Sequence, residues 1–192
     1  MSDMAIETTP GRITVAEYHR MAEAGIIRDG ERVELLDGAL VEMSPIGGPH
    51  WTIHAVLVPY LATRLTGRAL VAGQASVALG DFDEPQPDIL IVPPTPAKFA
   101  RTRPEPGEIL AIIEIADSSL AKDTKTKRLL YEKFGIRDYL VVDVGTQTLL
   151  HYRLRDVPQY GEPERLRRGE YVSLDAFPDV RLDVDRFLTP RD

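Results

Sequence analysis

The sequence contains no cysteine, which excludes disulfide bonds and thiolate-bound zinc. It also lacks any apolar run close to the roughly 20 residues that span a membrane. The first residues, MSDMAIETTPGR, do not show the basic and then apolar order of a signal peptide. These absences together predict a cytoplasmic protein in a reducing compartment.

The sequence also has no excess of positively charged residues. The chain has 23 Lys and Arg residues against 30 Asp and Glu residues, a formal net charge of −7, which argues against a surface that binds nucleic acids everywhere. Local basic surfaces are still compatible with this charge, because phosphate contacts depend on where the charges lie. Three clusters are either solvated faces or phosphate contacts: KFARTR (98–103), KDTKTKR (122–128) and RLRR (165–168).

The length of 192 residues and the hydrophobic content of 43% predict a single domain over residues 1–192, with flexible tails at 1–11 and 187–192. Helix and strand signals alternate irregularly, which indicates a mixed α/β sheet flanked by helices and not a repeating βαβ array. The expected helices cover residues 14–25, 50–65 (with a kink at Pro59) and 123–135. The expected strands lie at 69–80 (one strand, or two that meet near Gly73), 88–92 and 109–115, and in two hairpins at 31–43 and 138–154.

Two carboxylates occupy places where burial makes charge costly. Glu114 lies inside the apolar run ILAIIEIA, and Asp88 begins the run DILIV. A buried carboxylate costs several kcal/mol unless it is protonated, paired or bound to a metal. Adjacent strands would bring the two acids together, and a cation between them would offset their repulsion. Because oxygen ligands suit Mg²⁺ or Mn²⁺, we favour a metal site over two separate strand caps or arginine pairs.

A lysine stands where the predicted helix at 123–135 should bury an apolar side chain. One helical face is formed, at i, i+3, i+4 and i+7, by Lys127, Leu130, Tyr131 and Phe134. A lysine at the edge of such a face can extend to solvent. The helix follows the Glu114 strand directly, so the alternative is that Lys127 points back to the acids. There an ammonium group would orient a water nucleophile or offset charge on phosphate.

Further residues are candidates for the same site. Glu34 is a third acid in an apolar strand segment, where it either supports the site or faces the surface of the hairpin. His50 shares an apolar helical stripe with His54, a pattern more typical of a core histidine than of a ligand. Asp123 is explained sufficiently as a helix cap. Loop 93–108 is longer than most loops, and such loops are commonly functional.

Five segments in a fixed order carry a family resemblance. They are VELLDGALVEMSP with His50 after it, PDILIV, IIEIADSS, DTKTKRLLYEKFGIRDYLVVD and LLHYRL, and they span about residues 12–155. This pattern resembles the PD-(D/E)XK nuclease superfamily, whose fold is restriction-endonuclease-like, and within it the Uma-two family of endonucleases. The superfamily places a lysine two residues after the second acid, but this chain has Ala116 there. The resemblance assigns that role to Lys127 of the following helix.

The resemblance implies an endonuclease that hydrolyses DNA phosphodiester bonds with Mg²⁺ or Mn²⁺. It implies Asp88 and Glu114 as metal ligands, and Glu34 matches the acid of the family's first hairpin. Asp123 also matches a family position, and His50 and Tyr131 complete the list of site candidates. A DNA-facing group is expected at Lys98, Arg101, Arg103 and Lys125. By analogy with such folds we expect a homodimer.

Two other functions stay open at this point. The acidic net charge and the displaced lysine are compatible with a non-catalytic DNA-binding or assembly module of the same fold. A metal-dependent hydrolase of a small phosphate ester would tolerate an acidic surface better than a nuclease does. The choice between DNA and RNA is open as well.

Overall fold

The computed structural model describes residues 11–28 and 30–190. Of the predicted tails at 1–11 and 187–192, residues 1–10 and 191–192 therefore lie outside the described residues. The chain divides into two compact units, and each is described by itself. The first unit comprises the described part of Met1–Met43 together with Leu79–Pro85, and the second comprises Ser44–Ala78 and the described part of Gln86–Asp192. Among the described residues, none of the helices has the length and apolar character that crossing a membrane requires.

The first unit contains helix α1 (Val15–Glu23) and the hairpin of β1 (Val33–Leu36) and β2 (Ala39–Glu42). Both were predicted, and both form for the expected local reasons. The α1 helix begins with a capping box, in which the Glu17 N–H donates to Thr14 Oγ1 at 3.2 Å and the Thr14 N–H donates to Glu17 Oε2 at 2.8 Å. The hairpin turns at Asp37 and Gly38, whose φ angles of 50° and 75° fit a two-residue turn.

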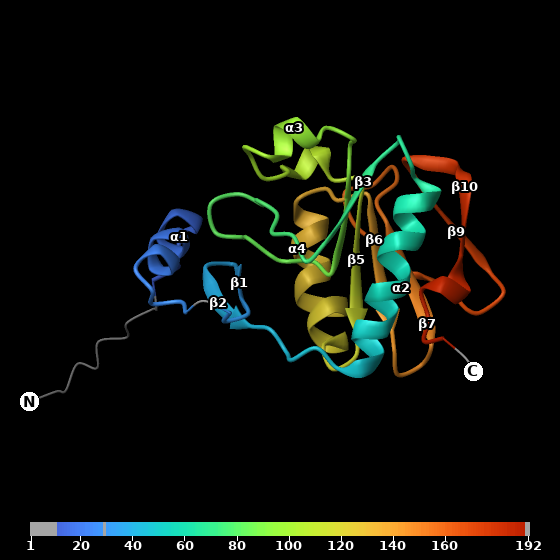
Figure 1. The fold of residues 1–192 in the computed structure, drawn as a ribbon, viewed down its shortest axis with the longest axis horizontal. Helices are drawn as coiled ribbons and strands as arrows, with labels where there is room; N and C mark the ends of the chain where they lie inside the picture. Colours follow the sequence, from blue (N-terminus) through green and yellow to red (C-terminus); the bar gives the residue numbers. More distant parts are fainter. Residues whose placement is uncertain (1–10, 29, 191–192) are drawn as a thin grey trace, which may run out of the picture. The chain divides into compact units, whose positions relative to one another are not determined.

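The second unit is built on a six-stranded sheet with the order β3-β4-β5-β6-β7-β8 (Figure 1). β5 and β6 are parallel, and the other neighbours are antiparallel, so the predicted mixed sheet is confirmed. The sheet strands are β3 (Leu70–Gly73), β4 (Ile89–Val92), β5 (Ala111–Ala116), β6 (Asp138–Asp143), β7 (Thr148–Arg153) and β8 (Glu164–Leu166). The remaining elements are α2 (Gly48–Arg64), α3 (Pro96–Phe99), η1 (Pro106–Glu108), η2 (Lys122–Lys127), α4 (Arg128–Lys133), β9 (Tyr171–Leu174), β10 (Phe177–Asp183) and η3 (Val184–Arg186).

Helices cover both faces of this sheet. The helix α2 continues through Pro59 and buries Ile53, Leu57 and Leu61 against alternate residues of β4 and β5, such as Ile113. The opposite face is covered by η2 and α4, where the ring of Tyr131 meets the ring of Tyr139 from β6 with centroids 4.9 Å apart. Because successive side chains of a strand alternate in direction, Glu114 lies on the α4 face and not on the α2 face.

Three predictions about the second unit need correction. The strand expected at 69–80 is shorter, since β3 ends at Gly73, and the alternative of a second strand is wrong because residues 74–80 form none. The helix expected from 123 to 135 begins with a π-helical turn, η2, and only then becomes the α-helix α4. The expected tail at 187–192 starts too early, because Phe187 and Leu188 are 0% and 1% exposed within the hydrophobic core. Apolar burial fixes this part of the chain after the η3 turn.

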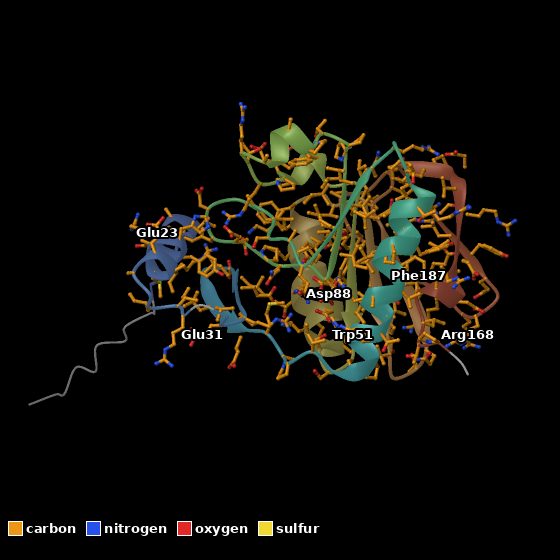
Figure 2. The ribbon with its side chains drawn as sticks, viewed as in Figure 1. Glu23, Glu31, Trp51, Asp88, Arg168 and Phe187 are labelled. Carbon is orange, nitrogen blue, oxygen red and sulfur yellow. The ribbon has the colours of Figure 1, made fainter. Side chains whose placement is uncertain are left out.

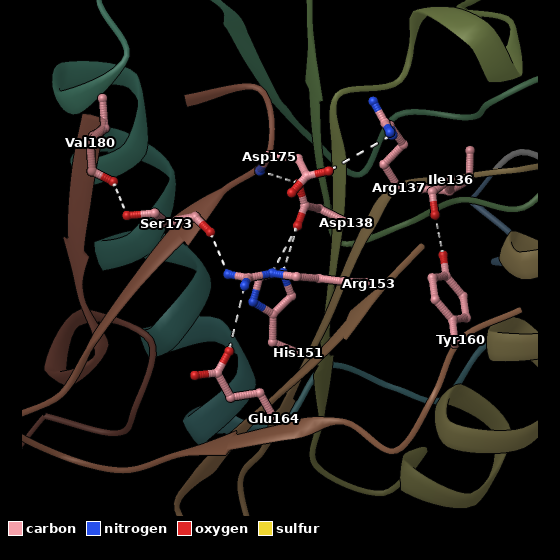
Figure 3. A network of polar contacts seen from close by, with 10 residues as sticks. All are labelled: Ile136, Arg137, Asp138, His151, Arg153, Tyr160, Glu164, Ser173, Asp175 and Val180. Carbon is pink, nitrogen blue, oxygen red and sulfur yellow. Dashed lines mark hydrogen bonds and ion pairs between the residues drawn. The ribbon is translucent and has the colours of Figure 1, made fainter. Parts of the chain in front are cut away.

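A buried polar network ties the hairpin of β9 and β10 to the main sheet (Figure 3). Asp138 of β6 lies 2.6 Å from the ring nitrogen Nε2 of His151 on β7, and both side chains are fully buried. The second Asp138 oxygen accepts the N–H of Asp175 at 2.6 Å, and Arg153 donates to the carbonyl of Ser173 at 2.7 Å. The network pairs the Asp138 carboxylate and the Arg153 guanidinium at the join between strands, and it leaves His151 Nδ1 buried without a hydrogen-bond partner among the described residues.

Candidate active site

The strand register brings the two predicted acids together. In the antiparallel pair of β4 and β5, Ile89 lies opposite Ile113, and extending this register by one residue places Asp88 opposite Glu114. The Asp88 N–H donates to Glu114 Oε2 at 3.3 Å. The Ile115 N–H donates to Asp88 Oδ2 at 2.8 Å. The two acids therefore belong to one buried cluster, which we call the acid pair; Figure 2 labels Asp88.

Glu114 receives two side-chain donors from the helical segment that covers its face of the sheet. Lys127 Nζ, the last residue of η2, lies 2.9 Å from Glu114 Oε1. The hydroxyl of Tyr131 in α4 donates to the same oxygen at 2.9 Å. The side chains of Lys127 and Glu114 are only 2% and 3% exposed. Lys127 therefore does not extend to solvent: it is buried against the acid pair, as the helical stripe predicted.

Asp88 is held from the opposite side by two histidines that lie one turn apart on α2. His50 Nε2 is 3.0 Å from Asp88 Oδ1. His54 Nε2 is 3.2 Å from the Asp88 backbone carbonyl and donates to it, because a carbonyl oxygen only accepts. His50 is not a plain core residue, and the bonded role of His54 was missed. The signal that could have shown it is their i, i+4 spacing, which puts both rings on one helical face.

The electrostatics of Asp88 favour its ionised form. Burial by itself raises the pKa of this carboxyl, since water is removed from the charge. The hydrogen bond and charge of His50, the Ile115 N–H and the charge of Lys127 outweigh burial, so the pKa of Asp88 lies below its ordinary value. The acid pair therefore has a nitrogen group at each carboxylate, His50 Nε2 at Asp88 and Lys127 Nζ at Glu114.

A third acid, Asp123, is buried in the π-helical turn close to the acid pair. The interpretation of Asp123 as a helix cap is wrong, because Asp123 lies inside η2. Its side chain accepts a hydrogen bond from the Ser119 hydroxyl. Burial raises the pKa of Asp123, and the charge of Lys127 only partly offsets this effect. Asp88 adds a repulsive contribution of the same sign as burial. π-Helical turns are rare and occur often at functional sites.

The ring of His54 fits closely against Gly73, the last residue of strand β3. A Cβ atom built on Gly73 would lie 2.6 Å from His54 Nε2, a distance that real Cβ contacts essentially never show. The absence of a side chain at Gly73 therefore allows the imidazole to reach the Asp88 carbonyl. This glycine is needed for a close approach, and its backbone is otherwise ordinary strand.

Other predicted site residues lie elsewhere. Glu34 is fully buried, so the alternative that it faces the surface of the hairpin is wrong. Glu34 belongs to the first unit, and its role in the site stays a prediction. Loop 93–108 leaves β4 at the end opposite Asp88, so the structure does not bring Lys98, Arg101 and Arg103 to the acid pair (Figure 1). Lys98 is ion-paired with Glu108. Lys125 is exposed, two residues before Lys127.

The cluster fits a divalent cation held mainly by water and substrate. Among residues 11–28 and 30–190, no group of three or more histidine, aspartate or glutamate side chains is arranged to hold a metal. Two carboxylates are nevertheless enough for Mg²⁺, which keeps several waters and binds substrate phosphate oxygens. His50 Nδ1 is buried and has no hydrogen-bond partner within the described part of the chain. Asp88 and Glu114 thus supply the carboxylate oxygens that such a cation binds.

Two comparisons with known proteins find matches, one to a family model and one to a solved structure. The model of the Uma2 (Uma-two) family, described as "Putative restriction endonuclease", matches residues 15–185. A crystal structure of a "putative nuclease belonging to DUF820" from Anabaena variabilis ATCC 29413 is similar, with a TM-score of 0.69 and 24% sequence identity. The match covers 91% of this chain and 97% of that chain. None of the curated proteins matches the sequence. The predicted restriction-endonuclease-like fold is confirmed.

Proposed function

The chain belongs to the Uma2 family, and we propose that it is a metal-dependent endonuclease that hydrolyses DNA phosphodiester bonds at the acid pair. The observation that carries this proposal is the convergence of Asp88 and Glu114 from adjacent strands, with a buried lysine 2.9 Å from Glu114. Carboxylates on adjacent strands supply the oxygen ligands that Mg²⁺ uses, and a neighbouring ammonium group favours a phosphate anion.

Asp88 and Glu114 would hold the Mg²⁺ or Mn²⁺ ion. When bound, such an ion polarises a phosphoryl oxygen and lowers the pKa of a water molecule. Strand pairing fixes the backbone of both acids, and the Ile115 N–H fixes one Asp88 oxygen, so little reorganisation is needed on binding.

Lys127 would orient the attacking water or offset the charge that develops on the phosphate. It is suited to this role because it approaches the acid pair from the helical side, and Tyr131 fixes the shared Glu114 oxygen. The strand position where the superfamily places its lysine holds the small buried Ala116, which leaves room for a side chain from η2. His54 would act as a positioning residue, since it bonds to the Asp88 carbonyl.

Phosphate contacts outside the acid pair would come from exposed basic side chains. Lys125 is the nearest of these in the sequence to Lys127, and it faces solvent from the same helical segment. Contacts of this kind release counterions, so DNA binding should weaken steeply with salt. We propose a homodimer as the active form, because two copies of the acid pair would serve the two strands of a duplex. Size-exclusion chromatography with light scattering tests this state.

The proposal is tested by nicking of supercoiled plasmid in the presence of Mg²⁺ or Mn²⁺. We expect wild type and Glu105→Gln, a change at an exposed loop acid, to nick the plasmid. We expect Asp88→Asn, Glu114→Gln and Lys127→Met to lose nicking by a factor of at least about 100. Circular dichroism checks that each variant is folded. Equal nicking by all variants would show that the acid pair is not the active site.

Metal binding is measured separately by melting temperature. Mg²⁺ should stabilise wild type and Glu105→Gln but not Asp88→Asn or Glu114→Gln, because a ligand that binds only the folded state raises stability by mass action. Stabilisation by metal without plasmid nicking would favour a small phosphate ester as substrate. Absence of both effects, with oligonucleotide binding retained, would favour the non-catalytic module.

A further inference from the structure

Trp51 is the only tryptophan of the chain, and its side chain is exposed one residue after His50 of the candidate site. It follows His50, whose ring contacts Asp88, and 64% of Trp51 is accessible to solvent. In Figure 2 the labelled Trp51 and Asp88 lie toward the same end of α2. An exposed tryptophan loses the hydrophobic stabilisation that burial of its large ring would give, so its position requires a reason.

The local sequence leaves the indole ring uncovered. A side chain on a helix lies over the turn that precedes it, and the residues three and four positions before Trp51 are Gly48 and Gly47. A Cβ atom on Gly48 would meet no atom within 4 Å, whereas one on Gly47 would lie 2.6 Å from Asp117 Oδ2, so the open space is the one beside Gly48. Ala55, four positions after Trp51, is small and exposed. Gly48 and Ala55, at helical spacings of three and four residues from Trp51, are thus too small to cover the ring.

The ring also makes no aromatic or cation–π contact among the described residues. Tyr171, another exposed aromatic residue, differs in this respect, because the guanidinium carbon of Arg181 lies 4.1 Å from its ring centroid. Trp51 therefore presents a free π-face from helix α2, and the residue before it, His50, contacts Asp88 of the acid pair.

We infer that Trp51 stacks on an unpaired nucleobase next to the phosphate that the acid pair attacks. This inference rests on the proposed nuclease function and adds the substrate class: a single strand, or a duplex opened at the cleavage site. The bases of an intact duplex stack on each other and offer no free face, whereas an unpaired base can stack on an aromatic side chain. Because every base has a π-face, such a contact tolerates different sequences.

The intrinsic fluorescence of Trp51 reports directly on this contact, since no other tryptophan contributes. Wild-type protein is titrated with a 12-nucleotide oligothymidylate in buffer containing EDTA, and again with the same strand annealed to its complement. We expect the single strand to quench Trp51 fluorescence strongly and the duplex to quench it weakly. A fluorescein-labelled copy of the oligothymidylate gives the dissociation constant by anisotropy.

Variants separate stacking from general binding. Trp51→Ala should weaken binding of the single strand by about 5- to 150-fold, and Trp51→Phe should weaken it less, because phenylalanine keeps a π-face. Tyr171→Ala is the matched control, an exposed aromatic residue on β9, and should bind as wild type does. Binding without quenching, or equal affinity of Trp51→Ala and wild type, would overturn the inference. So would the absence of any binding.

The outcomes also separate this inference from the proposed function. If the single strand quenches Trp51 while plasmid is not nicked, the stacking contact stands, but its place beside a cleaved phosphate fails together with the nuclease proposal. If plasmid is nicked equally by wild type and Trp51→Ala, with equal single-strand affinity, the nuclease proposal stands and the stacking role fails. A change of sedimentation in Trp51→Ala, with unchanged affinity, would show instead that Trp51 belongs to a protein interface.

Discussion

Lys127 Nζ lies 2.9 Å from Glu114 Oε1, and both side chains are almost completely buried. A buried ion pair is costly to form, because each ion loses its hydration, and it is far more costly to break by removal of one partner. The pair thus explains how the glutamate in the run ILAIIEIA is tolerated without a bound cation. It also means that stability and the proposed catalysis depend on the same lysine.

Replacement of Lys127 should therefore destabilise the protein. Lys127→Ala leaves the Glu114 carboxylate buried without its ammonium partner, and we expect the free energy of unfolding to fall by about 3–5 kcal/mol. Urea denaturation followed by circular dichroism measures this change. Lys125→Ala is the matched control, because Lys125 is exposed on the same helical segment, and it should change stability by less than about 0.5 kcal/mol. Equal effects of the two substitutions would contradict the buried pair.

The hydroxyl of Tyr131 should contribute less than the lysine but still measurably. Tyr131→Phe removes the donor to Glu114 Oε1 and keeps the ring, so we expect a loss of about 1.5–3 kcal/mol in the free energy of unfolding. Tyr171→Phe, at the half-exposed Tyr171, serves as the control and should be nearly neutral. A neutral Tyr131→Phe would mean that this hydrogen bond has no net effect on stability.

Gly73→Ala tests the fit of His54 without changing the histidine itself. The added methyl group would occupy the place of His54 Nε2, so the ring must move away from the Asp88 carbonyl. We expect a loss of about 1–3 kcal/mol in stability and a lower nicking rate. Gly107→Ala is the control, because a Cβ atom there meets nothing within 4 Å. Wild-type nicking and stability in Gly73→Ala would show that His54 does not position Asp88.

Asp123 should give the protein a measurable dependence on pH. Its pKa is raised in the folded state, chiefly by burial, so its favourable contribution is complete below the ordinary value of 3.8 and is lost as pH rises through the folded-state pKa. The stability of wild type relative to Asp123→Asn should therefore decrease from about pH 4 toward pH 7. Urea denaturation at several pH values measures this difference.

Asp179 provides a control of opposite sign for the Asp123 experiment. The hydrogen bond from Arg68 lowers the pKa of this exposed carboxyl, so its contribution is present above 3.8 and is lost as pH falls through the folded-state pKa. The stability of wild type relative to Asp179→Asn should increase with pH over the acidic range. The same slope for both variants would contradict the assigned environment of Asp123.

Much of the fold follows from local signals in the sequence. The capping box at Thr14 and the Asp37–Gly38 turn form where they were expected, because caps and turns depend on neighbouring residues. The strand elements β8, β9 and β10 were not predicted. They are short segments whose burial is decided by packing against the rest of the core, so periodicity alone does not show them.

In the candidate site too, some features follow from local sequence and others only from tertiary packing. The sequence by itself determined which charges are out of place, Glu114 in an apolar strand and Lys127 on an apolar helical stripe, because burial patterns repeat with the period of each element. Only the tertiary structure decided their partners. The register of β4 and β5 places Asp88 opposite Glu114, and the packing of α2 brings His50 and His54 to Asp88. Such contacts join residues far apart in the chain, which no local pattern specifies.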